Sequence, residues 1–148
     1  MKRRSMILFS VLMLVAILAM AGCQNGGGTL VVGTSADYEP FEYIDEDGNY
    51  TGFDIELMEE AASRMDMELE WQDIAFDGLI GALQSDKIDA IIAAMSATPE
   101  REEQVDFTDP YFIGADAIIV SEGSGIEITK NEDMTGHKVG VQTGTIQE

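Results

Sequence analysis

An anion-binding group of residues could form between positions 96 and 101. Arg101 carries a planar guanidinium that can pair with a carboxylate through two parallel hydrogen bonds, and Ser96 adds a hydroxyl donor. Thr98 followed by Pro99 predicts a helix start, where backbone N–H groups and the helix dipole also favour negative charge. A buried carboxylate needs fixed donors in place of water, so these residues suit carboxylate binding. The alternative is a surface arginine paired with a nearby acid such as Glu102.

A calcium loop is a second candidate, and the sequence argues against it. Four residues with side-chain oxygens stand at positions one, three, five and twelve of such a loop: Asp45, Asp47, Asn49 and Glu56. The sixth position, where the sharp turn requires glycine, is Tyr50. Gly48 follows Asp47 between two β-prone pairs, which predicts a hairpin turn instead. We expect no metal site and no cofactor.

Two further patterns carry little chemistry. His137 is the sole histidine and lacks cysteine or histidine companions, so neither a zinc site nor a histidine-based triad is indicated. We expect it in a solvated turn. The glycine-containing stretch 140–144 is not followed by a glycine-lysine pair, so it does not indicate a phosphate-binding loop.

Strands and helices must alternate to position these residues. Apolar or alternating runs predict strands at 30–33, 69–74, 88–95, 115–121 and 138–142. A hairpin at 41–51 is followed by a helix that Asp54 can cap, with apolar positions 55, 58, 62 and 65 on one side. A second helix begins near Phe76 and a short one after Thr98. This order predicts βαβ units and an α/β fold.

The first 22 residues are predicted to be a secretory signal peptide. Three basic residues precede an apolar run at 6–20, and two small residues then precede Cys23. The apolar run is shorter than the roughly 17 to 25 residues of a membrane-spanning helix. Cys23 is the sole cysteine, so we expect a lipid on its sulfur rather than an internal disulfide. The alternative is an inert thiol in an uncleaved leader. Residues 23–28 are predicted to form a flexible tether.

The chain is strongly acidic, with a formal net charge of -20 at pH 7. Removal of residues 1–22 takes away three positive charges and no negative ones. Such a field repels nucleic acid phosphates and anionic lipid surfaces. We therefore expect no nucleic acid partner, and membrane attachment through the lipid alone.

Six motifs in a fixed order resemble the bacterial extracellular solute-binding proteins of polar amino acid ABC importers. They are Tyr38-Glu39-Pro40-Phe41-Glu42-Tyr43, Gly52-Phe53-Asp54-Ile55, Phe76-Asp77-Gly78-Leu79-Ile80, Lys87-Ile88-Asp89-Ala90, Thr98-Pro99-Glu100-Arg101 with Val105-Asp106-Phe107, and Val139-Gly140-Val141-Gln142-Thr143-Gly144-Thr145. Residues 18–23 also resemble the bacterial lipobox, with Met20 where leucine is usual. The resemblance implies a type II periplasmic-binding-protein-like fold, in which two α/β lobes close on a ligand.

The resemblance also implies where the lobes begin and end. We expect a nearly complete first lobe at 29–118, a hinge strand at 119–121 and the start of a second lobe at 122–148. The chain stops where a helix should follow residues 143–145, so the sheet of the second lobe stays uncovered. We therefore expect an N-terminal fragment.

The resemblance assigns binding roles to nine residues. A carboxylate clamp maps onto Arg101, Ser96 and the backbone of Ala94, and an aromatic sandwich for the ligand side chain maps onto Tyr38 and Phe76. Phe76 can equally be core, because it begins the apolar side of its helix. Ser35 stands where relatives that bind basic or amide side chains often have aspartate. Three residues match the turn of the second lobe that faces the ligand: Gln142, Thr145 and Ile146, the last through its backbone N–H.

The expected function is that of a monomeric, lipid-anchored receptor on the extracytoplasmic face of the cell membrane, at the cell surface or in the periplasm. It would capture a free polar amino acid for the permease subunits of an ABC transporter. Two alternatives remain: an enzyme on the same scaffold, similar to cyclohexadienyl dehydratase or a lytic transglycosylase-associated domain, or an inactive truncated product. We expect no measurable amino acid binding by residues 23–148 alone, and binding by a version extended through the second lobe.

Overall fold

The computed structural model describes residues 27–148. The predicted signal peptide, Cys23 and most of the tether lie outside these residues. Within residues 27–148, no helix is long and apolar enough to cross a membrane. The elements follow one another as β1 (Thr29–Thr34), β2 (Asp37–Tyr38), β3 (Glu42–Ile44), β4 (Tyr50–Thr51), α2 (Phe53–Arg64), β5 (Glu68–Asp73), a 3-10 turn (Phe76–Gly78), α3 (Leu79–Gln84), β6 (Ala90–Ile91), α4 (Pro99–Glu102) and a second 3-10 turn (Asn131–Met134).

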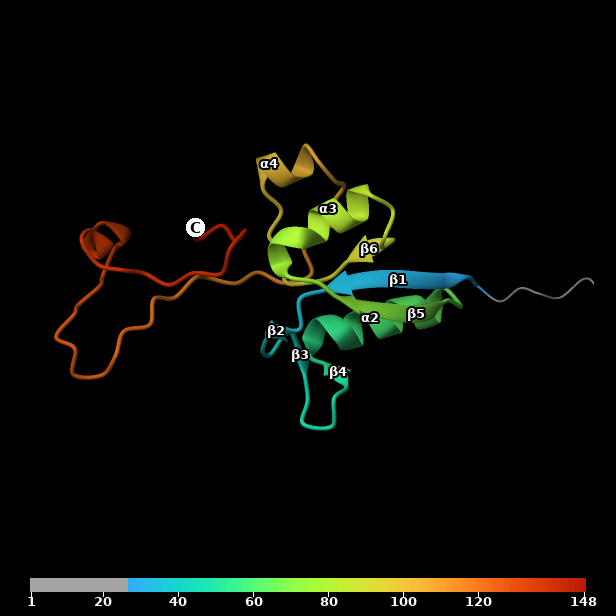
Figure 1. Cartoon of the computed structure of the whole chain (residues 1–148), viewed down its shortest axis with the longest axis horizontal. Helices are drawn as coiled ribbons and strands as arrows, with labels where there is room; N and C mark the ends of the chain where they lie inside the picture. Colours follow the sequence, from blue (N-terminus) through green and yellow to red (C-terminus); the bar gives the residue numbers. More distant parts are fainter. Residues whose placement is uncertain (1–26) are drawn as a thin grey trace, which may run out of the picture.

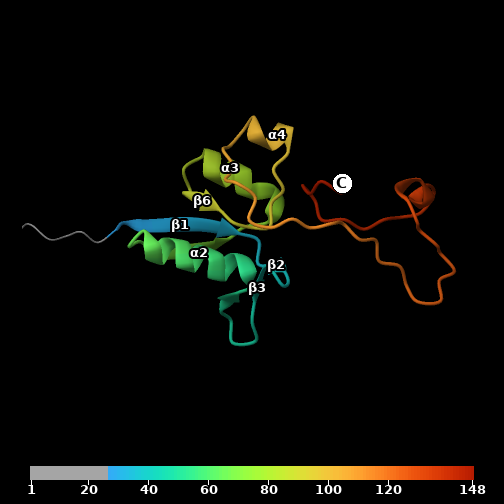
Figure 2. The same cartoon turned by 180° about the vertical axis from the view of Figure 1, so that it is seen from behind.

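A parallel three-stranded sheet forms the centre of the folded unit, in the order β5-β1-β6. β1 pairs with β5 along its whole length and with β6 at Val32 and Gly33. α2 lies on one side of β1 and α3 on the other (Figure 1 and Figure 2). Helices on both sides explain why Val32 is fully buried in an apolar strand. The α/β prediction is confirmed.

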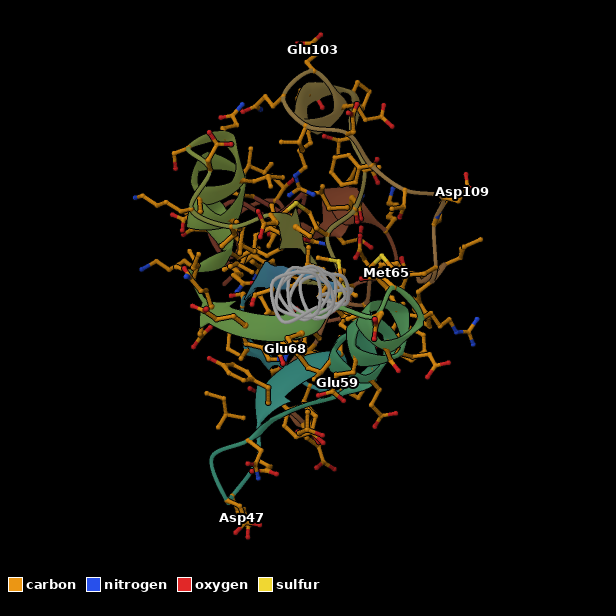
Figure 3. The ribbon with its side chains drawn as sticks, turned by 90° about the vertical axis from the view of Figure 1, so that its right-hand side faces the viewer. Asp47, Glu59, Met65, Glu68, Glu103 and Asp109 are labelled. Carbon is orange, nitrogen blue, oxygen red and sulfur yellow. The ribbon has the colours of Figure 1, made fainter. Side chains whose placement is uncertain are left out.

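The predicted hairpin is confirmed as part of a second sheet, in which β2, β3 and β4 pair antiparallel. Gly48 takes a positive φ of 86° at its turn. The Asp45 carboxylate accepts the backbone N–H of Asn49 over 2.8 Å and that of Asp47 over 3.0 Å. Hydrogen bonds from Asn49 above all lower the pKa of Asp45. This carboxylate therefore stabilises the turn. Asp47 marks the tip of the hairpin, at the opposite end of the view from Glu103 after α4 (Figure 3).

The prediction that Asp54 caps α2 is wrong. The helix begins at Phe53 after Gly52, and no side chain caps it. The N–H groups of Phe53 and Asp54 donate instead to the carbonyls of Pro40 and Phe41, over 3.0 and 2.9 Å. Asp54 lies in the first turn, fully buried. Because the loop before the helix already satisfies these N–H groups, the carboxylate is available for other contacts.

The main core lies between α3 and the sheet. Four of its side chains are buried: Leu79, Ala82, Ile88 and Ala93. Phe76 and Leu83 are among the partly buried residues that pack against them. In α2, Ile55 and Ala62 are buried, whereas Met65 is 52% exposed, so the predicted apolar stripe ends before Met65. The predicted strand at 69–74 and the predicted second helix are confirmed by β5 and α3.

The strand predicted at 88–95 is much shorter in the structure. Only Ala90 and Ile91 form β6, although the N–H groups of Asp89 and Ile92 also donate to carbonyls of β1. Ala94 then takes a positive φ of 44°, which turns the chain away from the sheet. The apolar run at 88–95 therefore predicts where β6 lies but not where it ends.

The strands predicted at 115–121 and 138–142 are wrong, and no helix follows residues 143–145. Residues 110–148 form an irregular segment with one short 3-10 turn (Figure 1). A strand needs a neighbour for its backbone N–H and C=O groups, and no segment of residues 27–148 pairs with either stretch. Ile119 is 94% exposed as a result. The assignment of 119–121 to a hinge stays a prediction.

Gly33→Ala is expected to destabilise the fold, because an added Cβ would lie 2.5 Å from Cδ1 of Ile88. Overpacking of this kind costs about 1 to 3 kcal/mol. Ile88→Val removes that atom and alone costs about 0.5 to 1.5 kcal/mol. In urea denaturation, the double variant should lose less stability than the two single variants together. Strictly additive losses would show that these side chains do not compete for the space.

Candidate functional site

Residues 98–102 form the capped helix start that the sequence predicts. α4 begins at Pro99, and the Thr98 hydroxyl accepts a hydrogen bond from the backbone N–H of Arg101 over 3.3 Å. The Thr98 carbonyl accepts from the same N–H over 3.0 Å. Since Pro99 has no N–H, the start of α4 offers a ligand fewer backbone donors than expected. The main contribution of α4 is to fix the side chain of Arg101.

Neutral groups hold the guanidinium of Arg101. Nη1 donates to the carbonyl of Ser96 over 2.6 Å, and Nη2 donates to the carbonyl of Gly144 over 2.8 Å. Cζ lies 5.4 Å from the centre of the Phe76 ring, within the range of a cation–π interaction. Among the described residues, Arg101 forms no ion pair with Glu102 or any other acid. The alternative of a surface ion pair is therefore wrong for this structure.

Arg101 consequently keeps a positive charge without a counter-charge in a half-buried position. Burial lowers the pKa of Arg101 because the cation loses water. The guanidinium has five N–H donors, and the two carbonyls leave others for an anion. An incoming carboxylate would supply both the missing charge and the missing acceptors. This chemistry makes Arg101 the centre of the candidate site.

The other two residues expected in the carboxylate clamp are engaged differently. Ser96 is exposed, and its carbonyl rather than its hydroxyl contacts Arg101. The backbone N–H of Ala94 donates to Oδ2 of Asp54 over 2.6 Å. The expected donation from Ala94 to a ligand therefore conflicts with this structure, because a buried carboxylate already occupies that N–H.

Residues 142–146 lie against the folded unit at two points. The amide of Gln142 donates to both carboxylate oxygens of Asp37, over 3.3 and 3.4 Å. Gly144, with a φ of +80°, brings its backbone next to Asp77, where a Cβ would lie 2.8 Å from that of Asp77. The Thr145 hydroxyl donates to the carbonyl of Gln142 over 2.7 Å, and Ile146 is exposed. The structure thus brings Gln142 and the backbone of Gly144 to the site, and places Thr145 behind them.

Tyr38 and Ser35 stand beside Asp37, which follows β1. Tyr38 is half-exposed and stacks on Phe41, with ring centres 5.5 Å apart. Ser35 is buried, and its hydroxyl donates to Asp37 over 3.4 Å. Phe76 packs against the core and also lies 5.4 Å from Cζ of Arg101, and its contact with a ligand side chain stays a prediction. Ser35 and Tyr38 follow the end of β1, and Ser96 and Arg101 follow the end of β6, where a ligand site of a parallel sheet is expected.

A comparison with protein families identifies the family of this chain. The model of the bacterial extracellular solute-binding proteins, family 3, matches residues 30–145. The chain belongs to this family. Membership confirms the predicted resemblance and, with the parallel sheet, the predicted type II periplasmic-binding-protein-like fold.

Relatives within this family have names that refer to amino acid binding. Arginine-binding extracellular protein ArtP of Bacillus subtilis is 45% identical over 128 residues, covering 86% of this chain and 49% of the relative. A mutant of ArgBP from T. maritima has 47% identity and a TM-score of 0.78, covering 80% of this chain and 52% of that chain. An ancestral amino acid-binding protein, a precursor of cyclohexadienyl dehydratase, has 43% identity and a TM-score of 0.68, covering 72% and 47%. The chain spans about half the length of the curated relatives it matches.

Four residues of the site region escaped the sequence prediction. Asp37 contacts Ser35 and Gln142, and its position two residues after Ser35 could have drawn attention to it. Glu42 and Asp54 are buried acids, and the Tyr111 hydroxyl donates to Asp54 over 2.8 Å. Both acids lie in motifs that carry the family resemblance, but neither motif indicates that its acid is buried.

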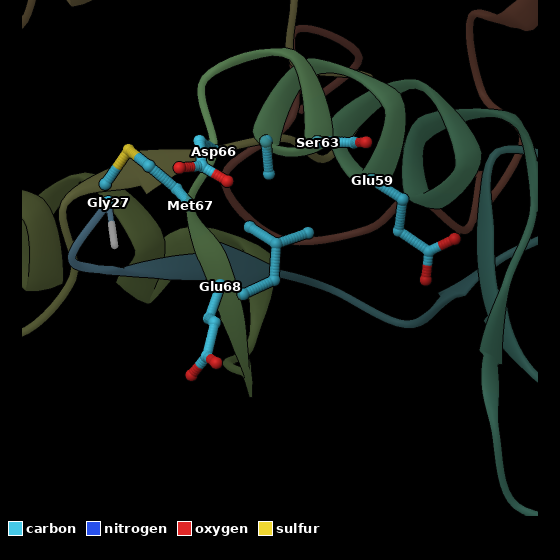
Figure 4. Close-up of a pocket in the computed structure, with 8 residues that line it drawn as sticks. Gly27, Glu59, Ser63, Asp66, Met67 and Glu68 are labelled. Atoms are coloured by element: carbon cyan, nitrogen blue, oxygen red, sulfur yellow. The ribbon is translucent and has the colours of Figure 1, made fainter. Parts of the chain in front are cut away.

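A hollow at the other end of the sheet has different chemistry. Glu59 and Ser63 come from α2, Asp66 and Met67 from the turn after it, and Glu68 from the start of β5 (Figure 4). Its carboxylates would repel the anion that Arg101 attracts. Among residues 27–148, no group of side chains could hold a metal ion. The hollow is therefore separate from the candidate site around Arg101.

Proposed function

We propose that this chain forms the nearly complete first lobe and the start of the second lobe of a non-enzymatic receptor that captures a free polar amino acid. The observation that carries the proposal is the half-buried guanidinium of Arg101, whose polar and aromatic contacts in the part of the chain that the structure describes are two carbonyls and one ring. A free amino acid presents a carboxylate that matches this cation, and burial makes the charge-assisted bond strong. Ser96, Tyr38, Phe76, Ser35, Gln142, Thr145 and Ile146 are the other proposed contacts.

The ligand class that we favour is a polar amino acid with a basic side chain. Asp37 supports this choice, because within residues 27–148 its carboxylate accepts hydrogen bonds only from the Gln142 amide and the Ser35 hydroxyl. Gln142 contacts Asp37, and Gly144 contacts Arg101, so the positive and negative charges border the same short stretch of chain. The relatives described as arginine-binding support the same class. The carboxylate of the ligand would face Arg101 and its cationic side chain would face Asp37.

The wider setting is proposed on the family relationship. The ligand would bridge two lobes and shift a hinge equilibrium from open to closed, and the permease subunits of an ABC transporter would recognise the closed form. Residues 29–118 would form the first lobe, 119–121 the hinge and 122–148 the beginning of the second lobe. A lipid on Cys23 would hold the monomeric receptor at the outer side of the cell membrane.

A screen of the twenty amino acids by thermal shift tests the proposal on the chain extended through a second lobe. A ligand present at a hundred times its Kd stabilises the folded state by about 2.7 kcal/mol. We expect arginine to raise the melting temperature most, and Asp37→Asn to reduce the effect of arginine more than that of glutamine. Residues 23–148 alone should show no shift. No response to any amino acid would rule out the proposed function.

The rival function is an enzyme on the same scaffold. The similarity to a precursor of cyclohexadienyl dehydratase supports keeping it as the second candidate. Turnover of prephenate or arogenate by the extended chain would favour the enzyme, and its absence together with a thermal shift by arginine would favour the receptor.

A further inference from the structure

Two buried acids, Glu42 and Asp54, lie within hydrogen-bonding reach of each other beside the candidate site, and no basic side chain among the described residues forms an ion pair with either. Glu42 of β3 is 1% exposed and Asp54 of α2 is 0% exposed. The two elements are joined at this point, since the N–H of Asp54 donates to the carbonyl of Phe41, the residue before Glu42. Each acid has one buried oxygen with no hydrogen-bond partner, Oε2 of Glu42 and Oδ1 of Asp54. Two ionised carboxylates would leave both oxygens unsatisfied and repel each other, which is costly in a buried place.

A single proton removes this conflict, and the surroundings determine where it sits. Oδ2 of Asp54 accepts the N–H of Ala94 over 2.6 Å and the hydroxyl of Tyr111 over 2.8 Å. Asp54 also lies in the first turn of a helix of twelve residues, where the dipole favours negative charge. The unpartnered oxygen of Glu42 has no comparable donor. Asp54 is therefore the carboxylate and Glu42 the acid.

We propose that Glu42 and Asp54 share one proton, held on Glu42 and donated to Oδ1 of Asp54, and that this pair positions the turn that carries the Arg101 site. Neither residue is proposed to contact the ligand. The evidence for the shared proton does not rest on the proposed function. The importance of the pair for ligand binding does rest on it.

The contacts of Asp54 explain how the pair positions the site. Its bond to Ala94 holds a residue with a positive φ at the point where the chain leaves β6. Two residues later, the carbonyl of Ser96 accepts the Nη1 donor of Arg101. The bond to Tyr111 fixes the chain after α4, and the Tyr111 ring stacks on Phe53 of α2 with ring centres 6.1 Å apart. One carboxylate thus connects α2, the turn of the site and the chain that leaves the first lobe.

The titratable groups around the pair agree with this arrangement. Burial raises the pKa of Glu42 from 4.5 to about 9, and the charges of Asp54 on α2 and Asp37 on β2 add to the effect. Burial and the hydrogen bond to Asp54 raise the pKa of Tyr111, so its phenol stays protonated. Between pH 4.5 and about 9 the folded chain holds one proton more than the unfolded chain. The contribution of this proton to stability is therefore greatest below this window and is lost as the pH rises through it.

The experiment measures urea denaturation of the full chain between pH 5 and pH 8 for the wild type and two variants. We expect the folding equilibrium constant of the wild type to fall by up to about tenfold per pH unit from this proton. Glu42→Gln keeps a donor for Asp54 and has no proton to lose, so it should remove that fall and be more stable than the wild type at pH 8. Glu42→Ala should be less stable than Glu42→Gln at every pH, because it leaves Oδ1 of Asp54 without a donor.

Two nuclear magnetic resonance signals test the proton and the positioning separately. The side-chain carboxyl carbon of Glu42 should stay at its protonated position up to pH 7, and a transition near pH 4.5 would overturn the shared proton. The amide proton of Ala94 should shift in Asp54→Asn and stay in place in Glu42→Gln, and an unchanged signal in Asp54→Asn would overturn the positioning. A parallel fall in stability of the wild type and Glu42→Gln would also refute the proposal. None of these readouts needs a ligand, so a failed amino acid screen and a failed proton test are distinguishable.

Discussion

Replacement of Arg101 by alanine is expected to cost about 2 to 5 kcal/mol of amino acid affinity in the chain extended through a second lobe. Among the described residues, the guanidinium of Arg101 donates only to neutral acceptors, so a ligand carboxylate would supply the missing counter-charge. Truncation would leave that carboxylate buried without a partner, which accounts for most of the loss. Isothermal titration calorimetry with the ligand that gives the largest thermal shift measures it directly.

Two variants control for the type and the place of the charge. Arg101→Lys keeps the positive charge but loses the planar fork, so its affinity should lie between that of the wild type and that of Arg101→Ala. Arg64→Ala removes an arginine that pairs with Glu60 on the exposed face of α2, and it should leave affinity unchanged. A loss of less than tenfold in Arg101→Ala would remove this residue from the site.

Gly52→Ala is expected to lower the free energy of unfolding by about 2 to 6 kcal/mol. Gly52 has a φ of 120° and a ψ of 175°, a backbone conformation that is almost restricted to glycine and costs other residues about 1 to 3 kcal/mol. An added Cβ would also lie 2.3 Å from the carbonyl oxygen of Phe41 and 2.9 Å from that of Pro40. These are backbone atoms, so neither can move without disturbing the start of α2, and overpacking costs about 1 to 3 kcal/mol more.

Two other glycines separate these contributions in the same urea denaturation series. Gly48 also has a positive φ, but no atom lies within 4 Å of an added Cβ, so Gly48→Ala should show the conformational cost alone. Gly81 lies in α3 with open space around it, and Gly81→Ala should be neutral or stabilising by up to about 1 kcal/mol. If Gly52→Ala cost no more than Gly48→Ala, the close contact with Phe41 would have no energetic effect.

The sequence predicted the elements whose signals are local. The Asp-Gly turn of the hairpin, the apolar run of β1 and the Thr98-Pro99 start of α4 each depend on neighbouring residues, and the structure contains all three. The end of β6 depends on the positive φ of Ala94, which no pattern in the apolar run indicates. The strands predicted after residue 110 failed because a strand is stabilised by its neighbours, and the described residues offer none there.

The candidate site could be predicted only in part. Chemistry made Arg101 a candidate beside the alternative of a surface arginine, and the family motifs favoured the clamp and supplied the other contacts. The roles of those contacts in binding stay predictions. The prediction for Asp54 was wrong because aspartate is a common N-cap residue and Asp54 directly precedes the apolar pattern of α2. Its burial follows from the packing of α2 against the hairpin, which is a tertiary property.

The order of the sheet also has a consequence for biosynthesis. β1 precedes every other described strand in the chain, yet it occupies the middle of the sheet, between β5 and β6. Both of its hydrogen-bonding edges therefore stay open until residues 68–73 and 90–91 have left the ribosome. A nascent chain with an apolar, unpaired central strand is exposed to aggregation and to chaperones during this interval. The sheet is therefore completed late in synthesis, when β6, the last described strand, pairs with β1, the first.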